Sequence, residues 1–175
     1  MDSISRTLIF TGNGKGKTTA ALGMALRASG HGMTVKIIQF IKADARTGEL
    51  AAVTNLPGVE IVQAGLGFVP SQDDPRFGEH RRAARKALDM SREAAESGKY
   101  GLIVLDEVCT AVSLHLLDES DVLDVVRSTT PGACIVLTGA GATPGLIEQA
   151  DTVTEMREIK HGMRSGVNAQ KGVEF

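Results

Sequence analysis

A glycine-rich segment between an apolar run and an alanine-rich run constrains the fold of this chain more than any other feature. Residues 11–19 read Thr-Gly-Asn-Gly-Lys-Gly-Lys-Thr-Thr, with the apolar residues 7–10 before them and the helix-favouring residues 20–26 after them. A strand, a glycine-rich turn and a helix in this order are typical of a phosphate-binding loop, because the turn and the helix N-terminus direct N–H groups at anionic oxygens. The segment predicts a nucleoside triphosphate site.

The side chains of this loop have separate expected roles. Lys17 can reach a phosphate, and the hydroxyl group of Thr18 can bind Mg²⁺. The residues expected to bind the nucleotide are Gly12, Asn13, Gly14, Lys15, Gly16, Lys17, Thr18 and Thr19.

The loop is one residue shorter than the usual pattern, in which four residues separate the two glycines. Here only residues 13–15 separate Gly12 from Gly16. A shorter loop should hold the phosphates differently from the loop of an ordinary kinase or ATPase. The alternative is a glycine turn without a ligand, but that leaves the Gly-Lys-Thr-Thr sequence at the helix start unexplained.

Composition and length exclude several functions. A chain of 175 residues is long enough for one domain with a substantial core. A net charge of −2, five Phe, one Tyr and no Trp argue against a nucleic-acid surface. Residues 1–6 lack the pattern of a signal peptide, and no apolar run approaches the roughly 20 residues that cross a bilayer. We expect a single domain, residues 1–175, in the cytoplasm, with no nucleic-acid or membrane partner.

Alternating apolar and helix-like runs predict an α/β fold, and continuous apolar runs favour strands buried on both faces. The expected strands are residues 7–11, 35–41, 59–62, 102–105, 134–138 and, more weakly, 152–156. The expected helices are residues 17–29, 47–54, 78–97, 109–116, 121–127 and 143–149. This order predicts a doubly wound, mainly parallel sheet of the P-loop (RecA-like) type, with ligands at the carboxyl ends of the strands. Residues 64–75 are expected to form an ordered loop near the site.

The second chemical signal is an apolar strand that ends in two acids, Asp106 and Glu107. A carboxylate at such a strand end can hold Mg²⁺ beside bound phosphates, and Mg²⁺ needs only one or two protein oxygens. We expect a metal site formed by Thr18, Asp106 and Glu107, with Lys17, Thr18 and Glu107 as catalytic residues. The alternative is that Asp106 caps the helix that follows it.

Three other features have ordinary structural interpretations. The basic residues of the helix expected at 78–97 alternate with acids, which favours a solvated face over a phosphate-binding one. His161 stands alone, which favours a hydrogen-bonding role over metal ligation. Cys109 and Cys134 lie beside apolar segments, as reduced core thiols do, and they lack the partners of a zinc site.

Together these segments resemble one family, the P-loop type of ATP-dependent corrinoid adenosyltransferases of cobalamin synthesis and salvage. The matching segments run in family order across nearly the whole chain, and the shortened loop is itself a family trait. They are residues 11–21, 30–32, 39–42, 48–49, 67–68, 104–107, 137–139, 150–155, 160–161 and 166–175.

The resemblance implies a transferase that moves the 5′-deoxyadenosyl group of ATP to a reduced cobalt(I) corrinoid and releases triphosphate, with Mg²⁺ as cofactor. It implies that Phe68 contacts the corrin, although Phe68 could instead be a core residue. It also implies a tail, residues 160–175, packed near the active site, a homodimer, and an electron-donating flavoprotein reductase as partner. The family's Trp near Phe68 is absent here, and Ala140 replaces the Arg that follows Thr-Gly in the family.

Two other functions stay open on the sequence. A P-loop kinase or ATPase of another class would transfer the γ-phosphate, but such enzymes prefer the full-length loop. A non-catalytic ATP-binding regulatory protein would bind the nucleotide without turnover, and the missing Trp and Arg lend this alternative some weight.

Overall fold

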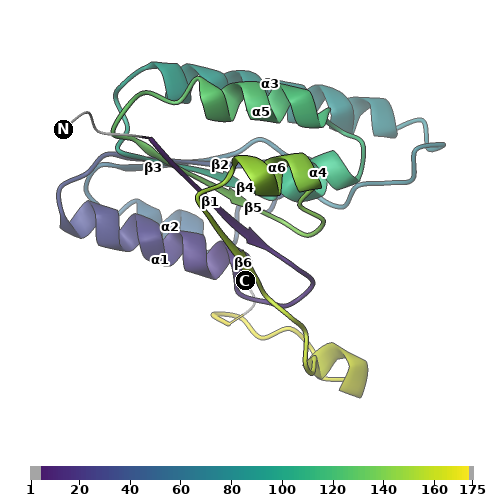
Figure 1. The fold of residues 1–175 in the computed structure, drawn as a ribbon. Coiled ribbons are helices and arrows are strands. Elements are labelled where there is room, and N and C mark those ends of the chain that lie inside the picture. The colour runs from purple at the N-terminus through teal and green to yellow at the C-terminus, as the bar shows by residue number, and fades with distance from the viewer. Residues whose placement is uncertain (1–4, 174–175) are drawn as a thin grey trace.

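The computed structural model describes residues 5–173, so the expectations for residues 1–4 and for residues 174 and 175 of the tail lie outside the described residues. Six strands form one sheet, with helices on both of its faces (Figure 1). The strands are β1 (Arg6–Thr11), β2 (Val35–Gln39), β3 (Val59–Gln63), β4 (Leu102–Asp106), β5 (Cys134–Thr138) and β6 (Thr152–Glu155). The helices are α1 (Lys17–Gly30), α2 (Gly48–Val53), α3 (Phe77–Glu96), α4 (Val108–Ser113), α5 (Glu119–Arg127), α6 (Pro144–Gln149) and the 3₁₀ helix η1 (Gly162–Ser165).

The strand order brings the expected site residues together at the carboxyl ends of the strands. The order is β3-β2-β4-β5-β1-β6, and every neighbouring pair is parallel. Because β5 lies between β1 and β4, the loop after β1 and the two acids at the end of β4 lie close together beside the end of β5. The predicted doubly wound α/β fold is therefore confirmed. The largest boundary difference is the end of α4, expected at residue 116 and observed at Ser113.

The two faces of the sheet carry two separate hydrophobic clusters, because successive strand residues point to opposite sides. On one face, α1 packs its buried residues Ala21, Ala25 and Ala28 against side chains such as Ile37 and Val104. The other face lies under α3, α4 and α5 and holds the larger cluster. The small alanine side chains let α1 lie close to the sheet, which fixes the start of α1. The glycine-rich loop between β1 and α1, residues 12–16, ends there, and we call it the phosphate loop.

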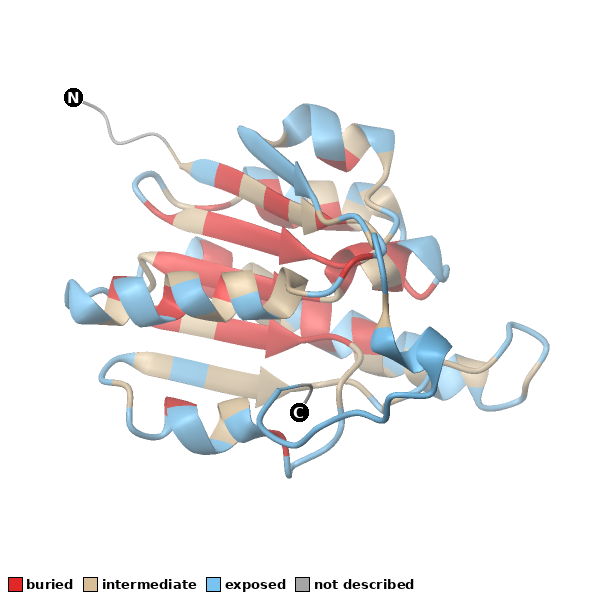
Figure 2. Cartoon of the chain, turned by 90° about the horizontal axis from the view of Figure 1, so that it is seen from below, coloured by how far each residue is buried: buried red, intermediate tan, exposed pale blue. Residues whose placement is uncertain are grey.

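Burial is not uniform across the sheet, and one expectation is wrong. The residues of β4 are all buried, as expected for a central strand, whereas all four residues of β6 are exposed (Figure 2). β6 lies at the sheet edge beyond β1, where it has a neighbour on one side only. Its alternation of Thr, Val, Thr and Glu is therefore that of an edge strand, not of a strand buried on both faces.

The segment between β3 and α3 is anchored beside the end of β2. The N–H of Ala64 donates to the carbonyl of Gln39 at 2.9 Å, and the N–H of Gly67 donates to the carbonyl of Ile41 at 2.7 Å. A Cβ at Gly65 would lie 2.2 Å from the carbonyl carbon of Ile41, so only glycine permits this close approach. The anchoring places Phe68 next to the segment that leads from β2 to α2.

The long helix α3 has a strongly charged outer face, as expected. Its buried residues include Ala84, Leu88 and Ala95, and its Arg85 forms an ion pair with Asp121 of α5 at 2.8 Å. Among the described residues, none of the helices has the length and apolar character needed to cross a membrane.

Both cysteines are free thiols, and their surroundings predict slow alkylation. Burial, followed by the charge of Glu107, raises the pKa of Cys109 to about 12, and burial raises the pKa of Cys134 to about 11. Because the thiolate is the nucleophile, the native protein at neutral pH should resist iodoacetamide while the denatured protein takes up two labels. Mass spectrometry measures the difference, and rapid labelling of Cys109 in the native protein would contradict the packing described here.

Candidate functional site

The phosphate loop joins β1 to α1 through two glycines with left-handed backbone angles. Gly12 has φ 94°, and Gly16, at the N-cap position of α1, has φ 107°. These values favour glycine strongly, which explains the spacing of the motif. Lys17 and Thr18 then occupy the first turn of α1, where backbone N–H groups have no partner within the helix.

The segment that follows β6 lies directly against this loop. The N–H of Gly14 donates to the carbonyl of Met156 at 2.7 Å, and the N–H of Met156 donates to the carbonyl of Thr11 at 2.8 Å. A Cβ at Gly12 would lie 2.4 Å from the oxygen of Met156. One N–H of the shortened loop is thus directed at the protein itself. The sequence gives no signal for this contact, because Met156 lies far from the loop in the chain.

This packing predicts that Gly14→Ala weakens nucleotide binding. An added Cβ would lie 2.7 Å from the carbonyl oxygen of Met156 and 2.8 Å from the carbonyl carbon of Arg157, so the loop or the segment must move. We expect a loss of about 1–3 kcal/mol in stability and a weaker affinity for ATP. Thermal unfolding and calorimetry measure both quantities. Gly30→Ala is the matched control, since its added Cβ meets nothing within 4 Å among the described residues; equal behaviour of the two variants would contradict the packing.

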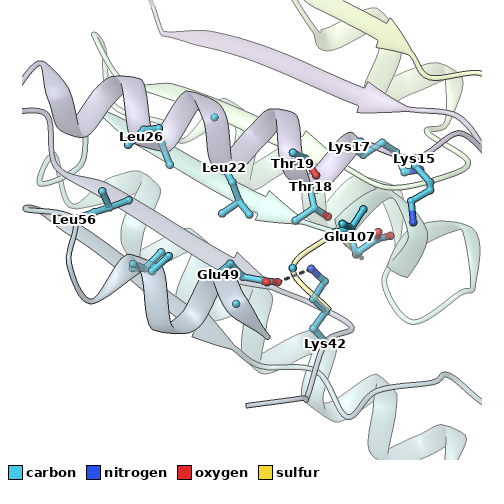
Figure 3. Close-up of a pocket in the computed structure, with 18 residues that line it drawn as sticks. Lys15, Lys17, Thr18, Thr19, Leu22, Leu26, Lys42, Glu49, Leu56 and Glu107 are labelled. Atoms are coloured by element: carbon cyan, nitrogen blue, oxygen red, sulfur yellow. Dashed lines mark hydrogen bonds and ion pairs between the residues drawn. The ribbon is translucent and has the colours of Figure 1, made fainter. Parts of the chain in front are cut away.

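Lys17 points into its own loop. Its ammonium nitrogen donates to the carbonyl oxygens of Gly12 at 2.9 Å and Gly14 at 2.8 Å. The positive charge therefore lies inside the curve of the loop, where a bound anion would lie. Figure 3 shows Lys17 and the exposed Lys15 at the same end of the pocket as Thr18.

Asp106 is the centre of a buried hydrogen-bond network at the strand ends. Its side chain is only 1% exposed, and one carboxylate oxygen accepts hydrogen bonds from the hydroxyl groups of Thr18 at 2.8 Å and Thr138 at 2.7 Å. The other oxygen accepts from the amide nitrogen of Gln39 at 3.0 Å. The interpretation of Asp106 as a helix cap is wrong, because Glu107 occupies the N-cap position of α4.

Glu107 has a different environment. Its backbone adopts a left-handed conformation with φ 65°, and its N–H donates to the hydroxyl oxygen of Thr138 at 2.9 Å. Its carboxylate accepts a hydrogen bond from Thr110 and lines the pocket beside the phosphate loop. A left-handed conformation is uncommon for a glutamate, and here it turns the side chain toward the pocket.

The oxygen atoms around Asp106 fit a hard cation. Thr18, Asp106 and Glu107 supply hydroxyl and carboxylate oxygens, which Mg²⁺ prefers. The side-chain oxygen of Gln39 is buried and lacks a hydrogen-bond partner among residues 5–173. Within the described residues no three His, Cys, Asp or Glu side chains gather, so a metal here would keep most of its water ligands.

A cavity of about 750 Å³ extends from the phosphate loop along the groove between α1 and α2 (Figure 3). Its polar end is formed by residues 15–19, with Lys42, Glu49 and Glu107. Its other end is apolar, and the residues there are Leu22, Leu26, Ala52, Val53 and Leu56. Gly172 and Val173 of the tail also line this cavity. Such a shape offers one end to an anion and the other to an apolar ring.

Phe68 lines a second cavity, which has a volume of about 680 Å³. The interpretation of Phe68 as a core residue is wrong. Its side chain is 93% exposed, far more than a packed core residue would be. Gly67 and residues of the segment that joins β2 to α2 line the same cavity.

His161 has a structural role. Its ring nitrogen Nδ1 accepts a hydrogen bond from the N–H of Met163 at 3.2 Å, which caps the 3₁₀ helix η1. The predicted hydrogen-bonding role is confirmed.

The fold and the glycine-rich loop define a class: this is a P-loop protein with a RecA-like α/β sheet. In agreement, a KaiC-like protein from Pyrococcus horikoshii has a similar fold, with a TM-score of 0.51 and 17% identity over 91% of this chain and 75% of that one. The chain belongs to the ATP:corrinoid adenosyltransferase family BtuR/CobO/CobP, whose family model matches residues 4–175.

Curated relatives carry the corresponding name. A corrinoid adenosyltransferase from Pseudomonas aeruginosa is 43% identical over 170 residues, which cover 96% of this chain and 82% of the relative. A corrinoid adenosyltransferase from Sinorhizobium is 38% identical and covers 96% of this chain and 79% of its own length. A third, from Escherichia coli, is 34% identical, with 96% and 84% covered. The predicted family is confirmed, and it is a family of transferases.

Proposed function

We propose that this protein transfers the 5′-deoxyadenosyl group of ATP to a cobalt(I) corrinoid and releases inorganic triphosphate. Family membership across nearly the whole chain is the observation that carries the proposal. The arrangement of the molecule supports it, since an anion-binding loop and an exposed aromatic side chain line neighbouring cavities.

The reaction is a nucleophilic substitution at the C5′ carbon of ATP. The electron pair of cobalt(I) forms the cobalt–carbon bond, and the C5′–O bond breaks with its electron pair on the triphosphate, so cobalt becomes formally Co(III). Cobalt(I) is itself a strong nucleophile. The protein therefore has to hold C5′ in line with cobalt and stabilise the charge on the leaving group.

In this proposal residues 12–19 hold the triphosphate. The ammonium of Lys17 would exchange the carbonyl oxygens of Gly12 and Gly14 for phosphate oxygens, which accept stronger, charge-assisted hydrogen bonds. Because the N–H of Gly14 is occupied by Met156, the loop offers fewer donors than a full-length one. The apolar end of the cavity would receive the adenosine.

Thr18, Asp106 and Glu107 are the residues that would hold Mg²⁺, and bound Mg²⁺ would add positive charge next to the triphosphate. Asp106 would also keep the hydroxyl of Thr18 in place, as its 2.8 Å hydrogen bond supports. Glu107 would bind the metal ion from the side of the site that faces the cavity, since Glu107 lines that cavity.

The proposed roles of the tail, of a reductase and of a second subunit follow from the family resemblance. The tail, residues 160–175, would pack near the active site, which the position of Gly172 and Val173 beside the cavity supports. A flavoprotein reductase would supply the electron that converts cobalt(II) to cobalt(I). A homodimer in the cytoplasm is the expected form of the enzyme.

Phe68 is proposed to contact the corrin and to assist the reduction of cobalt, which yields a specific prediction. Phe68→Ala should slow turnover about tenfold with cobalt(II) substrate and a reductant, and much less with chemically pre-reduced cobalt(I). Leu66→Ala is the matched control, since Leu66 is an exposed apolar residue of the same segment. An equal loss with both cobalt substrates would mean that Phe68 only shapes the segment.

Identification of the products formed from ATP tests the proposed function. The protein is incubated without oxygen with ATP, Mg²⁺ and a reduced corrinoid, and the phosphate products are separated by ion exchange. We expect triphosphate and an alkylated corrinoid in equal amounts. ADP with phosphate would instead indicate a kinase or ATPase of another class. ATP binding without a cobalt–carbon bond, across several corrinoids, would indicate a regulatory protein.

A further inference from the structure

Two side chains separate the cavity of the phosphate loop from the cavity of Phe68. Lys42 follows β2 and Glu49 lies in α2, and both residues line both cavities. We call Lys42 and Glu49 the shared wall. Two substrates that enter from opposite sides would meet at this wall.

The shared wall is an ion pair with a defined geometry. The ammonium nitrogen of Lys42 lies 2.8 Å from a carboxylate oxygen of Glu49 and 3.9 Å from the Asp106 oxygen that also accepts from Gln39. The Glu49 side chain is 14% exposed and that of Lys42 is 32% exposed. In Figure 3 Lys42 points toward Thr18 and Glu107, and Glu49 approaches it from the side of Leu22.

The electrostatics of the pair keep the ammonium at this position. Partial burial alone would raise the pKa of Glu49, but the hydrogen bond and charge of Lys42, together with backbone and Gln39 hydrogen bonds, lower it below its ordinary value. Glu49 therefore stays ionised at neutral pH. With Asp106 it places two acids around one ammonium. Movement of Lys42 away from them would leave the buried Asp106 and the mostly buried Glu49 without their cation.

We infer that Lys42 contacts the reacting end of ATP and stabilises the charge that develops on the oxygen leaving C5′, while Glu49 is a positioning residue that holds Lys42. The inference rests on the proposed function, since it assigns a residue to that same reaction. Cobalt donates the electron pair of the new bond, the pair of the C5′–O bond passes to the triphosphate oxygen, and Lys42 remains protonated throughout. Lys17 acts on phosphates deeper in the loop, so the two lysines have separate roles.

Single-turnover kinetics with pre-reduced cobalt(I) corrinoid test the inference. Lys42→Gln should lower the rate constant about 100-fold, the usual effect of removing one donor to a developing oxyanion, and change the Kd for ATP by less than about threefold. Lys42→Arg keeps the charge and should recover at least about a tenth of the rate. Lys99→Gln is the control, because Lys99 forms a 2.7 Å ion pair with Glu60 that is more exposed and lies at the opposite end of the sheet. An unchanged rate for Lys42→Gln, or a loss that appears only in ATP affinity, would overturn the inference.

A second variant covers the case in which Lys42→Gln does not fold. The double variant Lys42→Gln/Glu49→Gln removes both charges of the pair, and Asp106 keeps its three hydrogen bonds. It should show the same loss of about 100-fold. Glu49→Gln should slow the reaction in the presence of Lys42 but have little effect when Lys42 is already Gln. A double variant with full activity would refute the role of Lys42. Failure of the wild-type protein to form a cobalt–carbon bond would instead refute the proposed function, so the two failures are distinguishable.

Discussion

Lys17→Ala is expected to abolish the use of ATP, with a fall in kcat/KM of roughly 1,000-fold, and to leave the fold intact. The ammonium lies inside the curve of the loop, held by two carbonyl oxygens at 2.8 and 2.9 Å, so it is the cation that meets the triphosphate there. Removal of a charged donor at the site of a leaving anion has an effect of this size. Steady-state kinetics with pre-reduced corrinoid measure the loss.

The matched control for this variant is Arg27→Ala. Arg27 belongs to the last turn of the same helix, α1, and is exposed to solvent. Its removal should leave turnover and far-UV circular dichroism unchanged. Near-normal turnover in Lys17→Ala would show that the loop does not bind the triphosphate in the way proposed.

Asp106→Asn is expected to reduce both activity and stability. The carboxylate accepts three hydrogen bonds in a buried position, and the amide of Asn would direct N–H groups at a donor from Gln39 or from the threonines. A mismatch of buried donors destabilises by about 1–3 kcal/mol. The loss of negative charge also removes an expected Mg²⁺ ligand, so we expect kcat to fall at least about 100-fold and the required Mg²⁺ concentration to rise.

A magnesium titration of single-turnover rates, together with urea unfolding, separates the two effects. Asp124→Asn, on the exposed surface of α5, is the control and should change neither. A variant Asp106→Asn that is destabilised but retains wild-type rates and Mg²⁺ dependence would show that Asp106 has only a structural role.

The fold was predictable because its signals are local. Each apolar run, such as those of β4 and β5, predicts a strand, and the alanine-rich run of α1 predicts a helix. Their alternation along the chain predicts a parallel sheet. The error at β6 has the same origin, since an apolar-polar run does not show whether it lies at an edge. The residues 12–19 and Asp106 were found because glycines, lysine and strand-end acids lie in a recognisable order.

The remaining parts of the candidate site depend on contacts between distant segments. Met156 reaches Gly14 only because β6 pairs with β1. Lys42 and Glu49 lie in two family-matching segments, residues 39–42 and 48–49, but neither segment shows that the two side chains form an ion pair. The pair depends on how α2 follows β2. Gln39 was visible in the sequence as part of a strand and of the family-matching residues 39–42, but neither shows that its amide contacts Asp106.

In the proposed reaction the shortened loop holds ATP so that C5′, and not the terminal phosphorus, faces the cavity of Phe68. The most direct test is a crystal structure of the protein with ATP, Mg²⁺ and a corrinoid that cannot be reduced. We expect the triphosphate on residues 12–19, C5′ beside Lys42 and Glu49, and the corrin face on the other side of the shared wall, next to Phe68. A terminal phosphate at the wall, with the ribose directed away from Phe68, would contradict it.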